Sequence, residues 1–296
     1  MPLSDEHCPV LVTGAAGLLG HDLGPRLLAE APAGAAVHLT DVADLDVTDP
    51  SALESAMARL RPRTVVNLAA WTDVDGAQDH PAEARRLNAD AAGAVARAAA
   101  DAGALCVHIS TDFVFDGTKA GPYVEADPPG PRGVYARTKA EGEARVRDAA
   151  PDHHLIARTA WLYGAGGRNF IDAVLARARA GRPLRVVTDQ VGCPTWSADL
   201  ARALVAMVAS GVRGTVHACG AGEASRWNLA VAALRAAGLE AVPERITSDD
   251  LPPCAPRPAR AVLSCERLAR ETGFRFPPWQ ESVRRYVQGE PPTDAR

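Results

Sequence analysis

Tyr135 and Lys139 stand four residues apart in the segment YARTK. On a helix this spacing places the phenol and the ammonium on one face, one turn from each other. A phenol has an ordinary pKa near ~10, and a neighbouring positive charge lowers that pKa. The pair therefore predicts an acid/base group that can protonate an alkoxide or deprotonate an alcohol near neutral pH.

Lysine is rare in this chain, because only Lys119 and Lys139 are lysines among 32 Lys+Arg residues. Arginine cannot replace a compact ammonium that must lie between a phenol and a ligand hydroxyl. Tyrosine and lysine at this spacing also occur on ordinary amphipathic helices, so a catalytic interpretation depends on the rest of the chain.

A glycine-rich segment near the N-terminus supports that interpretation. Residues 9–13 (PVLVT) predict a buried strand, residues 14–20 (GAAGLLG) a turn, and residues 22–28 a helix. Gly14, Gly17 and Gly20 would allow a tight turn and close approach to a pyrophosphate, which the N–H groups at the helix start can bind. A βαβ unit that binds another ligand, or none, is the alternative.

A second predicted strand, residues 36–40, ends at Asp41, about 20 residues past the glycines. A carboxylate at this place is expected to bind the adenine ribose hydroxyls. Because it would repel a 2′-phosphate, the cofactor is expected to be NADH or NADPH with NADH favoured.

Length and composition indicate one large domain or two fused domains with a substantial core. The 296 residues are 47% hydrophobic and 23% charged, and the formal net charge of −4 gives no basic field for nucleic acid. No apolar run is long enough to span a membrane, and the start has no signal-peptide pattern, so a cytoplasmic location is expected. Six scattered cysteines without a CxxC pattern are expected to be reduced thiols.

Apolar strands alternate with helices along the chain. Further strands are predicted at 64–70, 105–110 and 155–159, and helices at 81–102 and 133–149. This order predicts an α/β fold, a Rossmann-type doubly wound parallel sheet with a smaller C-terminal substrate-binding region. We place the dinucleotide-binding domain at 1–160 and the mainly substrate-binding region at 161–296. Residues 184–187 are expected to interleave this region with the sheet, since they form a strand pattern after a helix.

These motifs resemble the extended short-chain dehydrogenase/reductases, and within that group the dTDP-4-dehydrorhamnose reductases. The further motifs that carry the resemblance occur in family order over nearly the whole chain: LDVTD (45–49), NLAAWTDVD (67–75), STDFVFDG (110–117), RTAWLYG (158–164), NF (169–170), DQVGCPT (189–195), PRP (256–258) and PWQ (278–280). The resemblance implies hydride transfer from a nicotinamide to the 4-keto carbon of a dTDP-linked deoxysugar, giving dTDP-L-rhamnose.

The resemblance also implies catalytic roles. Tyr135 would protonate the developing alkoxide, and Lys139 would lower the Tyr135 pKa and hold the nicotinamide ribose. Thr111 would donate a hydrogen bond to the carbonyl oxygen. Thr111 could instead be a strand-end cap.

Binding roles follow from the same resemblance. Gly17, Leu18 and Leu19 would face the pyrophosphate, Asp46 and Val47 would flank the adenine, and Ala70, Trp71 and Thr72 would line the cofactor groove. Asp112 and Trp161 would contact the sugar, and Arg257 would pair with the diphosphate. Trp161 could instead be ordinary core, and Asp46 with Asp49 a helix-capping cluster.

Three functions remain open, and the reduction that gives dTDP-L-rhamnose is the first. The second is the same reduction on another nucleotide-linked keto-deoxysugar, since pocket shape sets the sugar stereochemistry. The third is a non-catalytic regulatory subunit on the same fold, as in methionine adenosyltransferase, which the presence of Thr111, Tyr135 and Lys139 argues against. Some relatives use magnesium, but no acidic cluster here demands it, so no metal ligand is assigned. A homodimer is possible.

Overall fold

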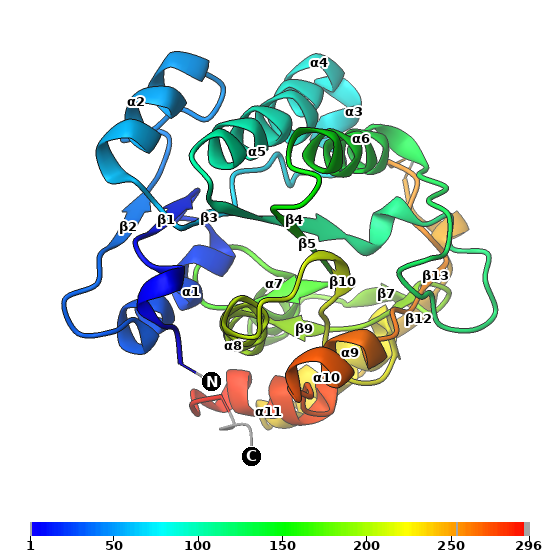
Figure 1. Ribbon diagram of the computed structural model, residues 1–296. Coiled ribbons are helices and arrows are strands. Elements are labelled where there is room, and N and C mark those ends of the chain that lie inside the picture. The colour runs from blue at the N-terminus through cyan, green and yellow to red at the C-terminus, as the bar shows by residue number, and fades with distance from the viewer. Residues whose placement is uncertain (1, 253, 293–296) are drawn as a thin grey trace.

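The computed structural model describes residues 2–252 and 254–292 and contains a six-stranded parallel sheet. The strand order β10-β5-β4-β3-β1-β2 reverses direction at β1, as in doubly wound folds, so the predicted fold class is confirmed (Figure 1). These strands are β1 (Val10–Thr13), β2 (Val37–Thr40), β3 (Thr64–Asn67), β4 (Leu105–Thr111), β5 (His154–Thr159) and β10 (Gly214–His217).

Helices cover both faces of this sheet, because its strands are apolar on both sides (Figure 1). Strand alternation sends Val10 and Val107 to the face with α1 and α8. It sends Leu11 and Cys106 to the opposite face with α2, α5 and α6. The covering helices are α1 (Leu18–Glu30), α2 (Pro50–Leu60), α5 (Ala92–Asp101), α6 (Gly133–Ala149) and α8 (Ser197–Ala209).

The predicted helix at 81–102 is helical throughout but contains a π-helical turn. It comprises α4 (Pro81–Arg85), π-helical residues Arg86–Ala91 and α5, and follows the short helix α3 (Gly76–Asp79). Asn88 lies in the π turn, where its amide accepts from Trp71 N–H (2.8 Å) and donates to the Thr138 hydroxyl (3.1 Å). Asn88 thereby ties the loop after β3 to α6. A Cβ at Gly142 would lie 2.1 Å from the Asn88 carbonyl oxygen, so only glycine permits this close approach.

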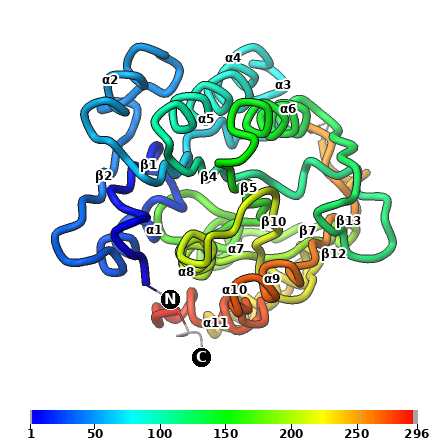
Figure 2. Tube along the Cα trace, viewed as in Figure 1, coloured from blue at the N-terminus to red at the C-terminus, as the bar shows by residue number. Residues whose placement is uncertain are grey.

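A second group of elements lies in the lower part of the molecule in Figure 1, and the tube in Figure 2 follows its course. Its apolar core joins α7, α9 and α11. The elements are β6 (Leu162–Tyr163), α7 (Phe170–Arg179), β7 (Arg185–Val187), β8 (Val191–Gly192), β9 (Thr195–Trp196), β11 (Ala224–Ser225), α9 (Arg226–Ala236), β12 (Glu244–Ile246), β13 (Arg260–Ala261) and α11 (Trp279–Gln288). Helix α10 (Glu266–Thr272) packs instead against α8 and β10, and its Leu268 belongs to the core beneath the main sheet.

Residues 184–187 do not join the main sheet, so the predicted place at which the C-terminal region interleaves with that sheet is wrong. β7 pairs with β12 in a separate two-stranded sheet, whereas β10 supplies the sixth strand of the main sheet, beside β5. A short apolar strand pattern indicates extended backbone but not its partner, which long-range packing selects. The division at residue 160 stays a proposal. Among the described residues, no helix is both long and apolar enough to span a bilayer.

Candidate active site

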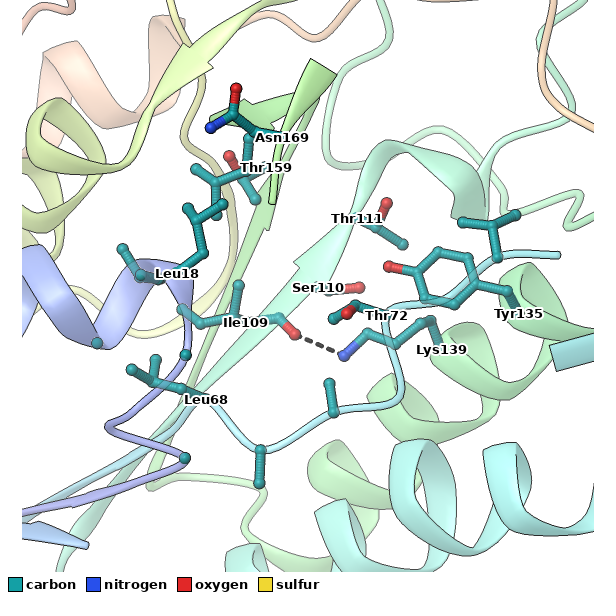
Figure 3. A pocket seen from close by; sticks show the side chains of 18 of the residues that line it. Leu18, Leu68, Thr72, Ile109, Ser110, Thr111, Tyr135, Lys139, Thr159 and Asn169 are labelled. Atoms are coloured by element: carbon teal, nitrogen blue, oxygen red, sulfur yellow. Dashed lines mark hydrogen bonds between the residues drawn. The ribbon is translucent and has the colours of Figure 1, made fainter. Parts of the chain in front are cut away.

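A cleft of about 820 Å³ lies at the carboxyl ends of β1, β3, β4 and β5 and extends to α7 and α9. Parallel sheets place the ends of neighbouring strands at one edge, which is where open α/β folds bind ligands. Figure 3 shows Leu18, Thr111, Tyr135 and Lys139 around this space, contributed by segments far apart in the chain. Every residue predicted to bind cofactor or substrate lines the cleft except Trp71.

The glycine loop forms one end of the cleft. Gly14 has a φ of +68°, and a Cβ there would lie 2.7 Å from the backbone nitrogen of Ala69. A Cβ at Gly20 would lie 2.2 Å from the carbonyl oxygen of Ala15. The loop therefore folds tightly against the segment after β3 and leads into α1, whose N-terminus suits an anion.

Asp41 supports this loop from the end of β2. Its carboxylate accepts hydrogen bonds from the backbone N–H of Ala16 (2.9 Å) and of Val42 (2.8 Å). Asp46 and Val47 line the same end of the cleft. The helix-capping alternative applies to Asp49, which accepts from Ser51 N–H at the start of α2, whereas the Asp46 carboxylate binds Thr48.

Tyr135 and Lys139 lie one turn apart on α6, and both side chains face the cleft (Figure 3). The expected lowering of the Tyr135 pKa is wrong for this structure: burial raises that pKa to about 12, and the Thr111 hydroxyl opposes the rise only in part. The Lys139 ammonium instead donates to the Ile109 carbonyl oxygen (2.7 Å). Burial also lowers the pKa of Lys139 to about 8.

Thr111 and Asp112 follow one another at the end of β4. The Thr111 hydroxyl donates to Asp112 Oδ1 (3.0 Å) and accepts from Phe113 N–H (3.2 Å), so Thr111 also caps a short 3₁₀ turn. Asp112 is 1% exposed, and its Oδ2 has no hydrogen-bond partner among the described residues. Burial raises the Asp112 pKa to about 7, with Thr111 and Arg226 opposing the rise. The unpartnered oxygen can accept from, or donate to, a ligand hydroxyl.

Trp161 has a left-handed φ of +47°, which is uncommon for a bulky residue. Its indole packs so closely on Gly192 that a Cβ there would lie 2.5 Å from the ring. The Arg226 guanidinium also stacks on this indole, 3.7 Å from the ring centroid. Trp161 thus belongs to both the cleft lining and the edge of a hydrophobic cluster.

Arg257 lies where this cleft meets a neighbouring one of about 830 Å³. Its guanidinium binds both carboxylate oxygens of Asp75 (3.1 and 2.7 Å) and the Ala255 carbonyl oxygen (2.8 Å). Asp75 therefore orients the arginine along the cleft wall, and pairing with a diphosphate stays a proposal.

Trp71 was predicted to line the cofactor groove, and this prediction is wrong, because its side chain is not part of the cleft wall. Its indole N–H donates to the Asp73 carbonyl oxygen (2.9 Å), and its ring lies 5.7 Å from that of His80. Asn88 fixes the Trp71 backbone, so the ring faces away while Ala70 and Thr72 line the cleft.

Sequence reasoning missed part of the cleft wall. Arg226 begins α9, and its stacking on Trp161 and Phe170 could not be inferred from its neighbours in the chain. Phe113 packs edge-on against Tyr135 at 5.5 Å, and its place in the STDFVFDG motif was an available signal. Arg168 also lines the cleft, as do Asn169 and Phe170, whose NF motif carried the resemblance without a role being assigned to either residue. Within the described part of the chain, no group of three or more His, Cys, Asp or Glu residues could hold a metal ion.

Comparison with known proteins gives consistent matches over most of the chain. Residues 8–290 match the family described as RmlD substrate binding domain. A dTDP-4-dehydrorhamnose reductase from Streptomyces griseus is 43% identical, covering 87% of this chain and 86% of its own. A probable dTDP-4,6-dihydroxy-2-methyloxan-3-one 4-ketoreductase from Streptomyces antibioticus is 42% identical, covering 93% and 92%. The crystal structure of a dTDP-4-dehydrorhamnose reductase from Bacillus anthracis with NADP has a TM-score of 0.90 at 30% identity, covering 95% and 98%.

Proposed function

This chain belongs to the RmlD substrate binding domain family, and we propose that it is the reductase that converts dTDP-4-dehydro-L-rhamnose to dTDP-L-rhamnose. The observation that carries the proposal is the single cleft that joins the glycine loop to Thr111, Tyr135 and Lys139. This arrangement supplies a dinucleotide site beside a proton donor and a carbonyl-binding hydroxyl.

Different residues of the cleft would perform different steps of the reduction. A nicotinamide cofactor bound along the glycine loop would supply the hydride. Thr111 would turn its hydroxyl hydrogen from Asp112 Oδ1 to the oxygen of the sugar carbonyl, and Tyr135 would give its proton to that oxygen as charge develops. The high pKa of Tyr135 keeps the phenol protonated at neutral pH, as a reductive proton donor requires.

Substrate positioning is assigned to the other end of the cleft. Asp112 and Trp161 would bind the sugar, and Arg257 the diphosphate, for which a guanidinium has matching geometry. Arg226 joins this set because its charge lies beside Asp112 and its guanidinium is stacked between aromatic rings. The proposal places the enzyme in the cytoplasm, includes a homodimer as a possible assembly, and assigns no residue to magnesium.

A ketoreductase for another nucleotide-linked sugar is the second candidate, because the Streptomyces antibioticus relative carries such a name at nearly the same identity. The deciding assay follows NADH oxidation with dTDP-4-dehydro-L-rhamnose, made enzymatically from dTDP-glucose. A reaction without the epimerase supplies the unepimerised 4-keto sugar. Turnover only with the epimerised sugar supports the proposal, and turnover only without epimerase moves the assignment to the second candidate. No turnover with either, despite NADH binding, would identify a regulatory subunit.

Asp41 is proposed to make the enzyme prefer NADH. Asp41→Asn should raise the ratio of kcat/KM for NADPH to that for NADH on the order of tenfold, because the negative charge near the 2′-phosphate is removed. Asparagine retains one acceptor oxygen, which can bind the Ala16 N–H and keep the glycine loop supported, although the Val42 N–H loses its separate oxygen. Steady-state kinetics with both cofactors measure the ratio, with the neighbouring Asp44→Asn as control. An unchanged ratio would show that Asp41 does not reach the ribose.

A further inference from the structure

A row of buried polar side chains crosses the sheet beneath α6. Thr13, Asn67 and His108 are register partners on β1, β3 and β4, and Lys139 of α6 stands at the end of the row. The Thr13 hydroxyl donates to Asn67 Oδ1 (2.8 Å), and Asn67 Nδ2 lies 3.4 Å from His108 Nδ1. His108 Nε2 lies 3.4 Å from Lys139 Nζ. All four residues are at most 3% exposed, and the reduction as described uses only Lys139.

The orientation of the Asn67 amide is fixed by two donors. Its Oδ1 accepts from the Thr13 hydroxyl and also from the backbone N–H of Ala69 (3.2 Å). A flipped amide would turn its NH₂ group toward the Ala69 N–H and leave two donors facing each other. Nδ2 of Asn67, which is a donor, therefore faces Nδ1 of His108.

This contact decides which ring nitrogen of His108 carries the proton. Burial and the neighbouring Lys139 hold the His108 pKa well below its ordinary value, so the ring is neutral. A neutral imidazole has one acceptor and one donor nitrogen. Since Nδ1 accepts from Asn67, Nε2 carries the hydrogen and directs it at Lys139 Nζ.

The hydrogen bond from His108 Nε2–H can form with only one of the two protonation states of Lys139. An ammonium has three donors and no acceptor, whereas a neutral amine has a lone pair that can accept from Nε2–H. We propose that His108 is a positioning residue that stabilises the neutral amine of Lys139 relative to the ammonium and so assists proton release from Lys139. This inference rests on the proposed reductase function.

The proton balance of the proposed step is simple. Once the substrate carbonyl carbon has received a hydride, Tyr135 transfers its O–H proton to the negatively charged oxygen, which becomes a hydroxyl. The Tyr135 phenolate then takes a proton from the Lys139 ammonium, so that an O–H bond forms as an N–H bond breaks. The lone pair left on Nζ accepts the hydrogen bond from His108 Nε2–H, and water returns a proton to Nζ after product release.

The surroundings of Lys139 make its two forms close in free energy. On its own helix Tyr135 lies one turn before it (Figure 3) and the charge of Glu143 acts on it from one turn after it. His108 faces it from β4, while Arg158 of β5 holds the Glu143 carboxylate. Glu143 favours the ammonium, and burial favours the neutral amine more strongly, which brings the Lys139 pKa to about 8. One hydrogen bond from His108 is therefore sufficient to shift the balance near neutral pH.

The tautomer itself can be measured on the wild-type protein. Nitrogen-15 NMR of protein labelled at its eight histidines distinguishes Nδ1–H from Nε2–H rings, and the His108→Gln variant assigns the resonances. We expect His108 to be the Nε2–H tautomer. An Nδ1–H ring would overturn the inference. Because no substrate is involved, this result is independent of whether the proposed function holds.

The pH profile of reduction tests the coupling. Asn67→Ala frees Nδ1 to carry the proton, so that Nε2 can accept from the Lys139 ammonium and raise its pKa. Because the ammonium supplies the proton, activity is lost as pH rises through that pKa. The alkaline limb of kcat should therefore move about one unit to higher pH.

The matched control is Cys106→Ala, a buried change on the same strand and face, two residues before His108. It should leave the alkaline limb in place. A merely structural role for the row predicts that Asn67→Ala lowers kcat equally at every pH, and that result would overturn the inference. If the Asn67→Ala variant does not fold, the NMR measurement of the His108 tautomer in the wild-type protein still tests the inference.

Discussion

Tyr135→Phe is expected to lower turnover by ~10²-fold or more while NADH still binds, because the variant loses its proton donor but retains the aromatic ring. Phenylalanine preserves the edge-on packing against Phe113, so the cleft should keep its shape. Single-turnover kinetics report the chemical step, and fluorescence titration with NADH reports binding.

The matched control for this loss is Tyr123→Phe. The Tyr123 hydroxyl donates to Asp116 Oδ1 (2.8 Å), away from the cleft, so removing it tests the effect of losing a tyrosine hydroxyl elsewhere in the chain. This variant should turn over within about twofold of the wild type, since it makes no contact with the reacting groups. Near-normal turnover in Tyr135→Phe would contradict the assignment of the proton donor.

Glu143→Ala is expected to destabilise the fold by ~3–5 kcal/mol, because it leaves the Arg158 guanidinium buried without its partner. The two side chains are 0% and 3% exposed and form two hydrogen bonds of 2.7 Å, and Ser110 donates a further bond of 2.6 Å to the carboxylate. Urea unfolding at neutral pH measures the change.

Two further variants distinguish the contribution of the buried Glu143–Arg158 pair to stability from that of an ordinary surface ion pair. Arg147→Ala removes the half-exposed partner of Glu143 and should cost at most ~1 kcal/mol. The double variant Glu143→Leu with Arg158→Met should recover much of the loss, because neither buried charge then lacks a partner. A Glu143→Ala protein as stable as Arg147→Ala would contradict the prediction.

The sign of the pH dependence follows from the same pair. Arg158 and Ser110 hold the Glu143 pKa below its ordinary value despite burial. A carboxylate with a lowered folded-state pKa contributes stability that is fully present above its unfolded-state pKa. That contribution is lost as pH falls through the folded-state pKa, so the difference between wild type and Glu143→Ala should shrink in acid.

Helix α6 illustrates how much the spacing of residues can predict. The bounds predicted for it, residues 133–149, coincide with those of α6, and the four-residue spacing alone places Tyr135 and Lys139 on one face. The prediction for Trp71 was wrong for an equally specific reason. The family resemblance placed it in the groove with Ala70 and Thr72, but Asn88 of the π-helical turn holds the Trp71 backbone and the indole N–H binds the Asp73 carbonyl oxygen.

The sequence by itself determined the strand–glycine–helix unit, the polar residues at strand ends and the pairing of tyrosine with lysine, because all of these depend on spacing within a few turns or strands. Only the tertiary structure decided that Arg226 stacks on Trp161, that β10 rather than β7 joins the sheet, and that Lys139 binds Ile109 and faces His108. These arrangements depend on contacts between segments distant in the chain. Burial there changes the free energy of each charge, and local spacing carries no information about that burial.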